Sequence, residues 1–158
     1  MSKKGFSYIE MLLAISIIMI MAAMAVIGMS VFYRNNVTKA ATKLESAMNK
    51  AKTVSMAQGT DKGTITIFKE GNSYYYYIGP KDDDAKKNAE KTKICTGNVT
   101  LQVSAGGGGT ADVTSLVYSY KPATGGFSSF PASSIIVTNG GTTKRLTFYQ
   151  LTGKCKNE

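Results

Sequence analysis

The stretch MLLAISIIMIMAAMAVIGMSVFY, residues 11–33, decides how the N-terminal part of the chain folds. Its 23 residues include no charged side chain and are interrupted only by two serines and a glycine. As a helix rising about 1.5 Å per residue it reaches roughly 34 Å, enough to cross the hydrocarbon core of a bilayer. Lys3 and Lys4 precede it, so the positive-inside tendency places the N-terminus in the cytoplasm and everything after Arg34 outside.

The composition excludes most catalytic and metal-binding functions. The 158 residues include 19 Lys and Arg but only 10 Asp and Glu, for a formal net charge of +9, and no His. Without histidine the chain lacks the commonest acid/base group at neutral pH and the commonest metal ligand. Cys95 and Cys155 are too far apart in sequence for a zinc-binding CxxC pattern. We therefore expect neither an enzyme nor a protein that holds a metal or cofactor.

Glu10, at the start of the apolar stretch, discriminates between interpretations of the N-terminus. A secretory signal peptide explains the lysines, and Ala23-Met24-Ala25 offers a small-x-small cleavage site, but the apolar stretch exceeds the usual 7–15 residues. A plain membrane anchor explains the length and leaves the acid without a role. A lone carboxylate at the edge of lipid costs a few kcal/mol unless it finds a partner, so Glu10 is a candidate functional residue.

The residues Lys3-Lys4-Gly5-Phe6-Ser7-Tyr8-Ile9-Glu10, followed by an apolar helix, resemble the prepilin signature of type IV pilins and pseudopilins. The resemblance implies that a membrane-embedded prepilin peptidase cuts after Gly5, discards residues 1–5 as a leader and methylates the new N-terminal Phe6. It also places Glu10 at the acid that this family uses in assembly.

The resemblance further implies polymerisation through the helix of residues 6–33 into a type IV pilus or a secretion pseudopilus. Cleavage creates a positive amine on Phe6, and pairing it with the Glu10 carboxylate of a neighbouring subunit would set the axial stagger of packed helices. Before assembly, the protein would be a single-pass membrane protein with its head outside the cytoplasm. The alternative is an anchored head that never polymerises. Many pilins have a proline near Ile27, so whether the helix loosens at Gly28 stays open.

Residues 34–58 predict a continuation of the same helix, ending at Gly59, with one apolar face. Steps of three and four residues assign to that face Val37, Ala40, Ala41, Leu44, Ala47, Met48, Ala51 and Val54. The single helix from Phe6 to Gln58 would be about 80 Å long, with its second half packed on a soluble domain.

Residues 59–158 predict a head made of an antiparallel β-sheet, so the fold class is α+β with the helix laid across one sheet face. Short runs of β-branched and aromatic residues predict six strands, at residues 63–69, 74–78, 98–104, 115–120, 134–138 and 145–151. Glu70-Gly71-Asn72-Ser73 predicts a turn that joins the first two strands as a hairpin, and Asn139-Gly140-Gly141 predicts a tight hairpin turn between the last two. This plan resembles the pilin fold and, more weakly, that of minor pilins and H-type pseudopilins.

Cys95 and Cys155 lie in the part expected outside the cytoplasm, where disulfides form. Many pilins close their C-terminal region with a disulfide, and the resemblance implies the same here. Closing a loop of about 60 residues would contribute roughly 4 kcal/mol by loop entropy. Two free thiols are the alternative.

Asp82, Asp83 and Asp84 invite a calcium interpretation, but they are contiguous and do not alternate as in a calcium-binding loop. A solvated loop or the start of a short helix is favoured, because aspartate is a good N-cap residue.

The head and the second half of the helix carry 17 basic and 9 acidic side chains, a net +8. Lys144, Arg145, Lys154 and Lys156 gather near the last predicted hairpin. A basic patch is what binding to DNA or to another anionic surface requires, so a DNA- or surface-binding minor pilin is the alternative function.

Overall fold

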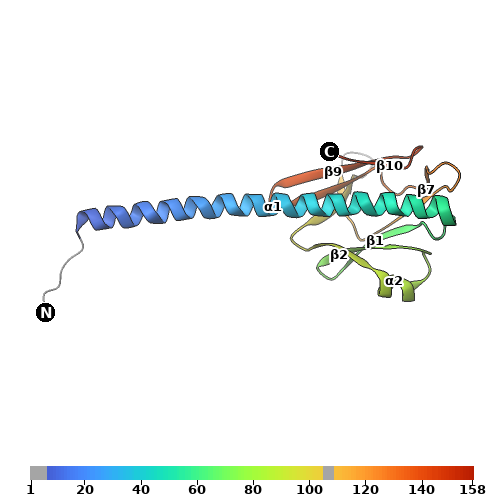
Figure 1. The fold of residues 1–158 in the computed structure, drawn as a ribbon, viewed down its shortest axis with the longest axis horizontal. Coiled ribbons are helices and arrows are strands. Elements are labelled where there is room, and N and C mark those ends of the chain that lie inside the picture. The colour runs from blue at the N-terminus through green and yellow to red at the C-terminus, as the bar shows by residue number, and fades with distance from the viewer. Residues whose placement is uncertain (1–6, 105–108) are drawn as a thin grey trace.

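The computed structural model describes residues 7–104 and 109–158, and it has an α+β architecture. One long helix, α1 (Tyr8–Gln58), extends well beyond a head domain and runs along it (Figure 1). The other elements are β1 (Ile65–Glu70), β2 (Ser73–Ile78), α2 (Asp84–Glu90), β3 (Thr92–Thr96), β4 (Thr100–Ser104), β5 (Thr110–Asp112), β6 (Ser115–Tyr120), β7 (Phe127–Ser129), β8 (Ser134–Asn139), β9 (Thr142–Tyr149) and β10 (Lys154–Asn157).

The strands form two antiparallel sheets where the sequence predicted one. The first has the order β3-β2-β1-β6-β7 and the second the order β10-β9-β8-β4-β5. The four strands that the sequence did not predict, β3, β5, β7 and β10, have three to five residues each and lie at the edges of the sheets. Short edge strands contain too few residues to show an alternating pattern.

Both predicted hairpins are present, with two-residue turns. In β1–β2, Glu70 pairs with Ser73 across a turn that includes Gly71 at φ +57°. In β8–β9, Asn139 pairs with Thr142, and the turn residues Gly140 and Gly141 have φ of +54° and +83°. Two successive left-handed residues make the type of turn that fits the twist of antiparallel strands, which is why a pair of glycines occurs here.

The second half of α1 lies between the two sheets and packs on strands of both (Figure 1). Its buried face confirms seven of the eight predicted residues: Val37, Ala40, Ala41, Leu44, Ala47, Met48 and Ala51. The prediction for Val54 is wrong, because Val54 is only partly buried and the adjacent Ser55 is fully buried instead. The Ser55 hydroxyl donates a hydrogen bond of 2.8 Å to the carbonyl oxygen of Tyr120, at the end of β6.

Aromatic side chains join the two sheets beneath α1. Tyr118 of the first sheet lies 5.2 Å, between ring centroids, from Phe148 of the second. Phe127 lies 4.6 Å from Tyr120 and 5.1 Å from Phe130. These buried rings, together with the apolar face of α1, make the head a single hydrophobic core.

The short helix α2 confirms that the aspartate run begins a helix. The Asp83 carboxylate accepts a hydrogen bond of 3.1 Å from the backbone N–H of Lys86, as an N-cap residue does. On the next turn, the Lys87 ammonium lies 4.8 Å from the centroid of the Phe68 ring, so α2 packs on the face of the first sheet that points away from α1.

Candidate assembly site

The first half of α1 exposes its apolar side chains as far as Phe32, and Tyr33 after it lies against the β8–β9 turn of the head. The window that makes α1 long and apolar enough to cross a membrane is entirely unburied. Large hydrophobic residues are exposed in an almost continuous series from Tyr8 to Phe32. An unpartnered apolar surface of this size requires lipid or other protein around it.

The two serine hydroxyls within this apolar half are satisfied by the helix itself. Ser16 Oγ donates to the Leu12 carbonyl oxygen at 2.8 Å, and Ser30 Oγ donates to that of Ile27 at 2.8 Å. Neither side chain therefore needs water or a partner, which is what insertion into hydrocarbon requires.

Glu10 lies in the first turn of α1, with its side chain exposed. One carboxylate oxygen accepts a hydrogen bond of 2.9 Å from the backbone N–H of Ser7. The carboxylate is therefore held at the very start of the helix, beside the point where a new N-terminus at Phe6 would lie. Gly5 and Phe6, which carry the predicted cleavage and methylation, lie outside the described residues.

The helix runs without interruption through Gly28, although the sequence did not decide whether the helix loosens at this residue. A Cβ added to Gly28 would meet no atom within 4 Å, so packing does not explain the glycine. Its remaining physical effect is its low helix propensity, about 1 kcal/mol below alanine.

The predicted disulfide between Cys95 and Cys155 is not formed in the structure, and this prediction is corrected. Cys95 lies on β3 in the first sheet, beside Lys43 of α1. Cys155 lies on β10 in the second sheet, where burial and, to a smaller extent, Glu45 of α1 raise the pKa of its thiol. The two cysteines are thus on edge strands of different sheets, and α1 packs on both of these strands.

The four basic residues near the last hairpin do not share one face. Lys144 lies two residues before the buried Leu146 and therefore points to the same, inward face of β9, whereas Arg145 points to the opposite face. Lys154 and Lys156 flank the buried Cys155 and therefore also point outward.

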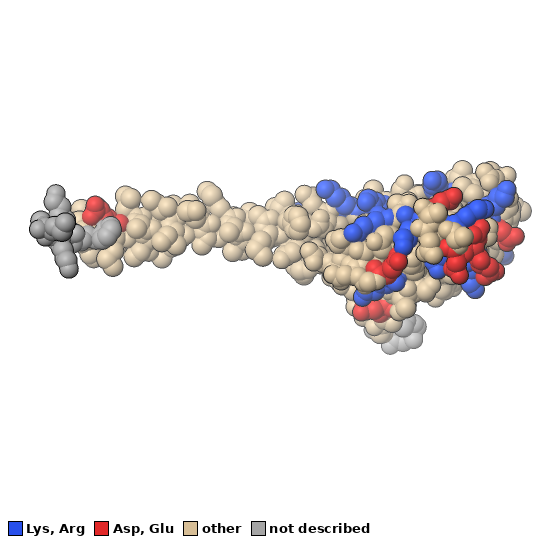
Figure 2. All heavy atoms as spheres, turned by 90° about the horizontal axis from the view of Figure 1, so that it is seen from below, with Lys and Arg blue, Asp and Glu red and all other residues tan. Residues whose placement is uncertain are grey.

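The positive charge of the outward-pointing residues Arg145, Lys154 and Lys156 is partly neutralised, because the Lys156 ammonium forms an ion pair of 2.9 Å with Glu158. Basic and acidic side chains are intermixed on the face of the head shown in Figure 2, which is seen from below and has β9 and β10 on its far side. The strand pattern separates Lys144 from the other three residues of the predicted basic patch, which stay on one outward face.

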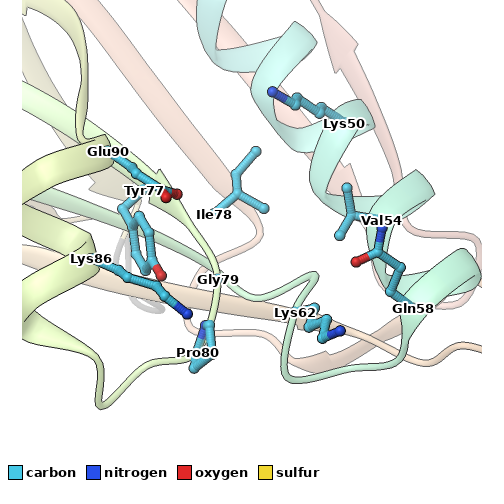
Figure 3. Close-up of a pocket in the computed structure, with 10 residues that line it drawn as sticks. All are labelled: Lys50, Val54, Gln58, Lys62, Tyr77, Ile78, Gly79, Pro80, Lys86 and Glu90. Carbon is cyan, nitrogen blue, oxygen red and sulfur yellow. The ribbon is translucent and has the colours of Figure 1, made fainter.

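A cavity of about 410 Å³ lies beside the end of α1, and nothing in the sequence predicted it (Figure 3). Val54 lines it, which explains why Val54 is not in the core. The other lining residues come from α1 itself, the loop before β1, β2, the loop after β2 and α2, so they include segments far apart in sequence. No local motif joins these segments, so only the fold reveals the cavity.

The fold is that of an α+β protein with one long N-terminal helix. The second half of this helix packs in a head made of two sheets, and the first half is long and apolar enough to cross a membrane. No protein-family model, curated protein or solved structure matches the chain.

Proposed function

We propose that this chain is a prepilin-type subunit that is cleaved after Gly5, methylated at Phe6 and polymerised through its N-terminal helix into a type IV pilus or a secretion pseudopilus. The observation that carries the proposal is the continuity of α1, which joins an uncovered apolar half to a half that is packed in the head. The same helix can therefore lie in a bilayer before assembly and in a bundle of helices afterwards, while the head stays outside.

The position of Glu10 supports this proposal. Its carboxylate is at the first turn of α1 and is the only charged group in the first half of that helix, so in a bundle it would need a positive partner. The amine created on Phe6 of a neighbouring subunit supplies that charge. Only one axial stagger of two identical helices brings the two groups together, so the pair would set the subunit register.

The proposal implies three kinds of partner: the prepilin peptidase, the membrane with its assembly platform, and other pilin subunits. In this role the protein does its work by assembly. The subunit is a single-pass membrane protein with its head outside the cytoplasm before it enters the fibre.

Mass spectrometry of the mature chain tests the processing step. We expect a chain that begins at Phe6 and is heavier by one methyl group. An intact Met1 would contradict cleavage altogether, and a new terminus at Val26 would identify a secretory signal peptide instead.

The charge pair is tested with Glu10→Gln, which removes the charge and keeps the size of the side chain. We expect normal membrane insertion and a folded head, but strongly reduced incorporation into isolated fibres. Ser16→Ala is the matched control in the same apolar half, because that hydroxyl bonds only to its own helix. Normal incorporation of Glu10→Gln would refute the pairing.

A further inference from the structure

The cavity beside the end of α1 is open to solvent and has two walls of different origin (Figure 3). Lys50, Val54 and Gln58 line it from α1. Tyr77 from β2 and Lys86 from α2 face them across the cavity. Its volume of about 410 Å³ is within the range of small-molecule sites.

Its charged residues are mostly basic. Lys50, Lys62 and Lys86 come from α1, from the following loop and from α2, and Glu90 is the one acidic residue of the lining, so the ionised groups sum to +2. Lys86 also forms a 3.4 Å ion pair with Asp83. Lys50 and Lys62 form no ion pair within the described part of the chain.

A hydroxyl group also lies in the wall. Tyr77 is only 2% exposed as a whole residue, but its hydroxyl is not one of the buried unpaired polar atoms of the described residues, so it can reach a molecule in the cavity. Burial, Asp83 and Glu90 raise the pKa of Tyr77, so the phenol stays protonated and available as a hydrogen-bond donor.

Gly79 makes room for this hydroxyl. A Cβ at Gly79 would lie 2.1 Å from Tyr77 Oη, so any larger residue would displace the ring. Val54, Ile78 and Pro80 supply the apolar part of the lining. The cavity thus combines positive charges and the Tyr77 hydroxyl with a surface on which the carbon skeleton of a ligand can lie.

We propose that this cavity binds a phosphate monoester carried on a sugar-like ring. Lys50 and Lys62, which form no ion pair within the described residues, offer two positive charges to a phosphate monoester, whose own charge is about −1.5 to −2 at neutral pH. Lys86 is shared with Asp83 and adds a weaker attraction. Lysine binds phosphate as a point charge. The Tyr77 hydroxyl donates to a phosphate or sugar oxygen, and the apolar wall contacts the ring.

The site is separate from the assembly surface. It lies at the end of α1 that is packed in the head, whereas the uncovered apolar residues end at Phe32. Binding here is therefore independent of polymerisation, and either proposal can fail without the other.

Isothermal titration calorimetry of the full chain in micelles of a polyoxyethylene detergent tests the proposal, since this detergent carries neither phosphate nor sugar. The probes are glucose 1-phosphate, inorganic phosphate and glucose. We expect glucose 1-phosphate to bind tightest, inorganic phosphate to bind more weakly and glucose to give no measurable heat. Binding of inorganic phosphate as tight as that of the ester would overturn the ring contact, and absence of binding of both would overturn the site.

Three variants locate the binding. Lys50→Gln and Lys86→Gln should each weaken glucose 1-phosphate binding about tenfold, as expected for losing a charge-assisted contact. Tyr77→Phe, which removes only the hydroxyl, should weaken it several-fold without changing the far-ultraviolet circular dichroism.

Lys121→Gln is the matched control, because Lys121 is exposed and lies outside the cavity lining. Equal loss in Lys121→Gln would mean a non-specific charge effect and would refute the site. Tighter binding of a duplex oligonucleotide than of glucose 1-phosphate, lost in the same variants, would also refute it in favour of a nucleic-acid surface.

Discussion

At the scale of single residues, Ser55 ties the end of α1 to the first sheet. It is fully buried and donates to the Tyr120 carbonyl at 2.8 Å, and a Cβ on Gly63 would lie 2.3 Å from its own Cβ. Ser55→Ala keeps this packing but leaves a buried acceptor without its donor. We expect the head to lose about 1–2 kcal/mol of unfolding free energy.

We expect this loss to appear as a lower midpoint of thermal unfolding in Ser55→Ala. The near-ultraviolet circular dichroism of the tyrosines follows the transition. Thr53→Ala is the control, because the exposed Thr53 hydroxyl bonds only to the Asn49 carbonyl of its own helix at 3.0 Å. A change in Ser55→Ala no larger than in Thr53→Ala would show that the hydrogen bond contributes nothing to stability.

The two thiols are expected to be free but unreactive. Burial raises the pKa of Cys95 to about 11 and that of Cys155 to about 12, from an ordinary value of 9.0. At pH 8 the folded protein should react with a thiol reagent through Cys95 about a hundredfold more slowly than a free thiol. After denaturation without reductant, two thiols per chain should titrate, and none would mean that the disulfide forms.

The same shifts predict how stability depends on pH. A raised thiol pKa means that the folded state favours the neutral form. The stabilisation is therefore complete below pH 9 and is lost as the pH rises through 11 toward 12. Cys155→Ala should reduce this alkaline loss, and an unchanged pH profile would contradict the assignment.

Residues whose role depends on distant neighbours were not predictable from the sequence. Ser55 is polar and its partner lies 65 residues away, so a pattern of apolar residues could assign only its neighbour Val54 to the core. The separation of Cys95 and Cys155 depends on which sheet each enters, and sequence spacing does not contain that information. Glu10 was identified because the surrounding stretch makes a charge there conspicuous.

At the scale of elements, the β8–β9 hairpin is held against the helix at its turn. Both Gly140 and Gly141 have positive φ, so alanine at either position strains the backbone. A Cβ at Gly140 would also lie 2.6 Å from the Tyr33 ring, whereas one at Gly141 meets nothing within 4 Å.

We therefore expect Gly140→Ala to lower the unfolding free energy by about 1 kcal/mol more than Gly141→Ala does. Adding Tyr33→Ala to each variant should remove the excess, because it removes the clash and leaves the strain. The thermal midpoints of the two glycine variants, of the two double variants and of Tyr33→Ala, each compared with the unchanged protein, complete the double-mutant cycle. If Gly140→Ala still costs more than Gly141→Ala in the presence of Tyr33→Ala, the contact between Gly140 and Tyr33 is refuted.

The elements with a strong local pattern were predicted and the others were not. The helix of residues 34–58, both hairpins and the strand of residues 115–120 each carry a period or a turn signal of their own. The last predicted strand ended too late, at 151, because β9 ends at Tyr149 and Leu151 is an exposed turn residue. The division into two sheets is decided by which edges pair, and no local pattern determines that.

At the scale of the whole molecule, charge and burial are distributed in opposite ways along α1. In Figure 2 the stalk carries no basic or acidic side chain between the acidic atoms at its start and the head. Every buried residue of α1, in contrast, lies between Val37 and Ser55. The helix therefore has one half that needs an apolar environment and one half that supplies the core of the head.

This division predicts that a chain consisting of residues 34–158 folds without the apolar half. Removing residues 1–33 deletes no described residue that is buried in the core and loses only the contact of Tyr33 with the β8–β9 turn. It also removes almost the whole apolar surface that the described residues expose, and such a surface promotes association in water.

We expect residues 34–158 to be monomeric in aqueous buffer by size-exclusion chromatography, with a thermal midpoint within a few degrees of that of the full chain in micelles. Lengthening this chain back to residue 23 should restore aggregation, because it re-exposes Val26, Ile27, Met29 and Phe32 without adding a core contact. If residues 34–158 fail to fold while the full chain is folded, then the first half of α1 stabilises the head, and the two halves of the helix are not energetically independent.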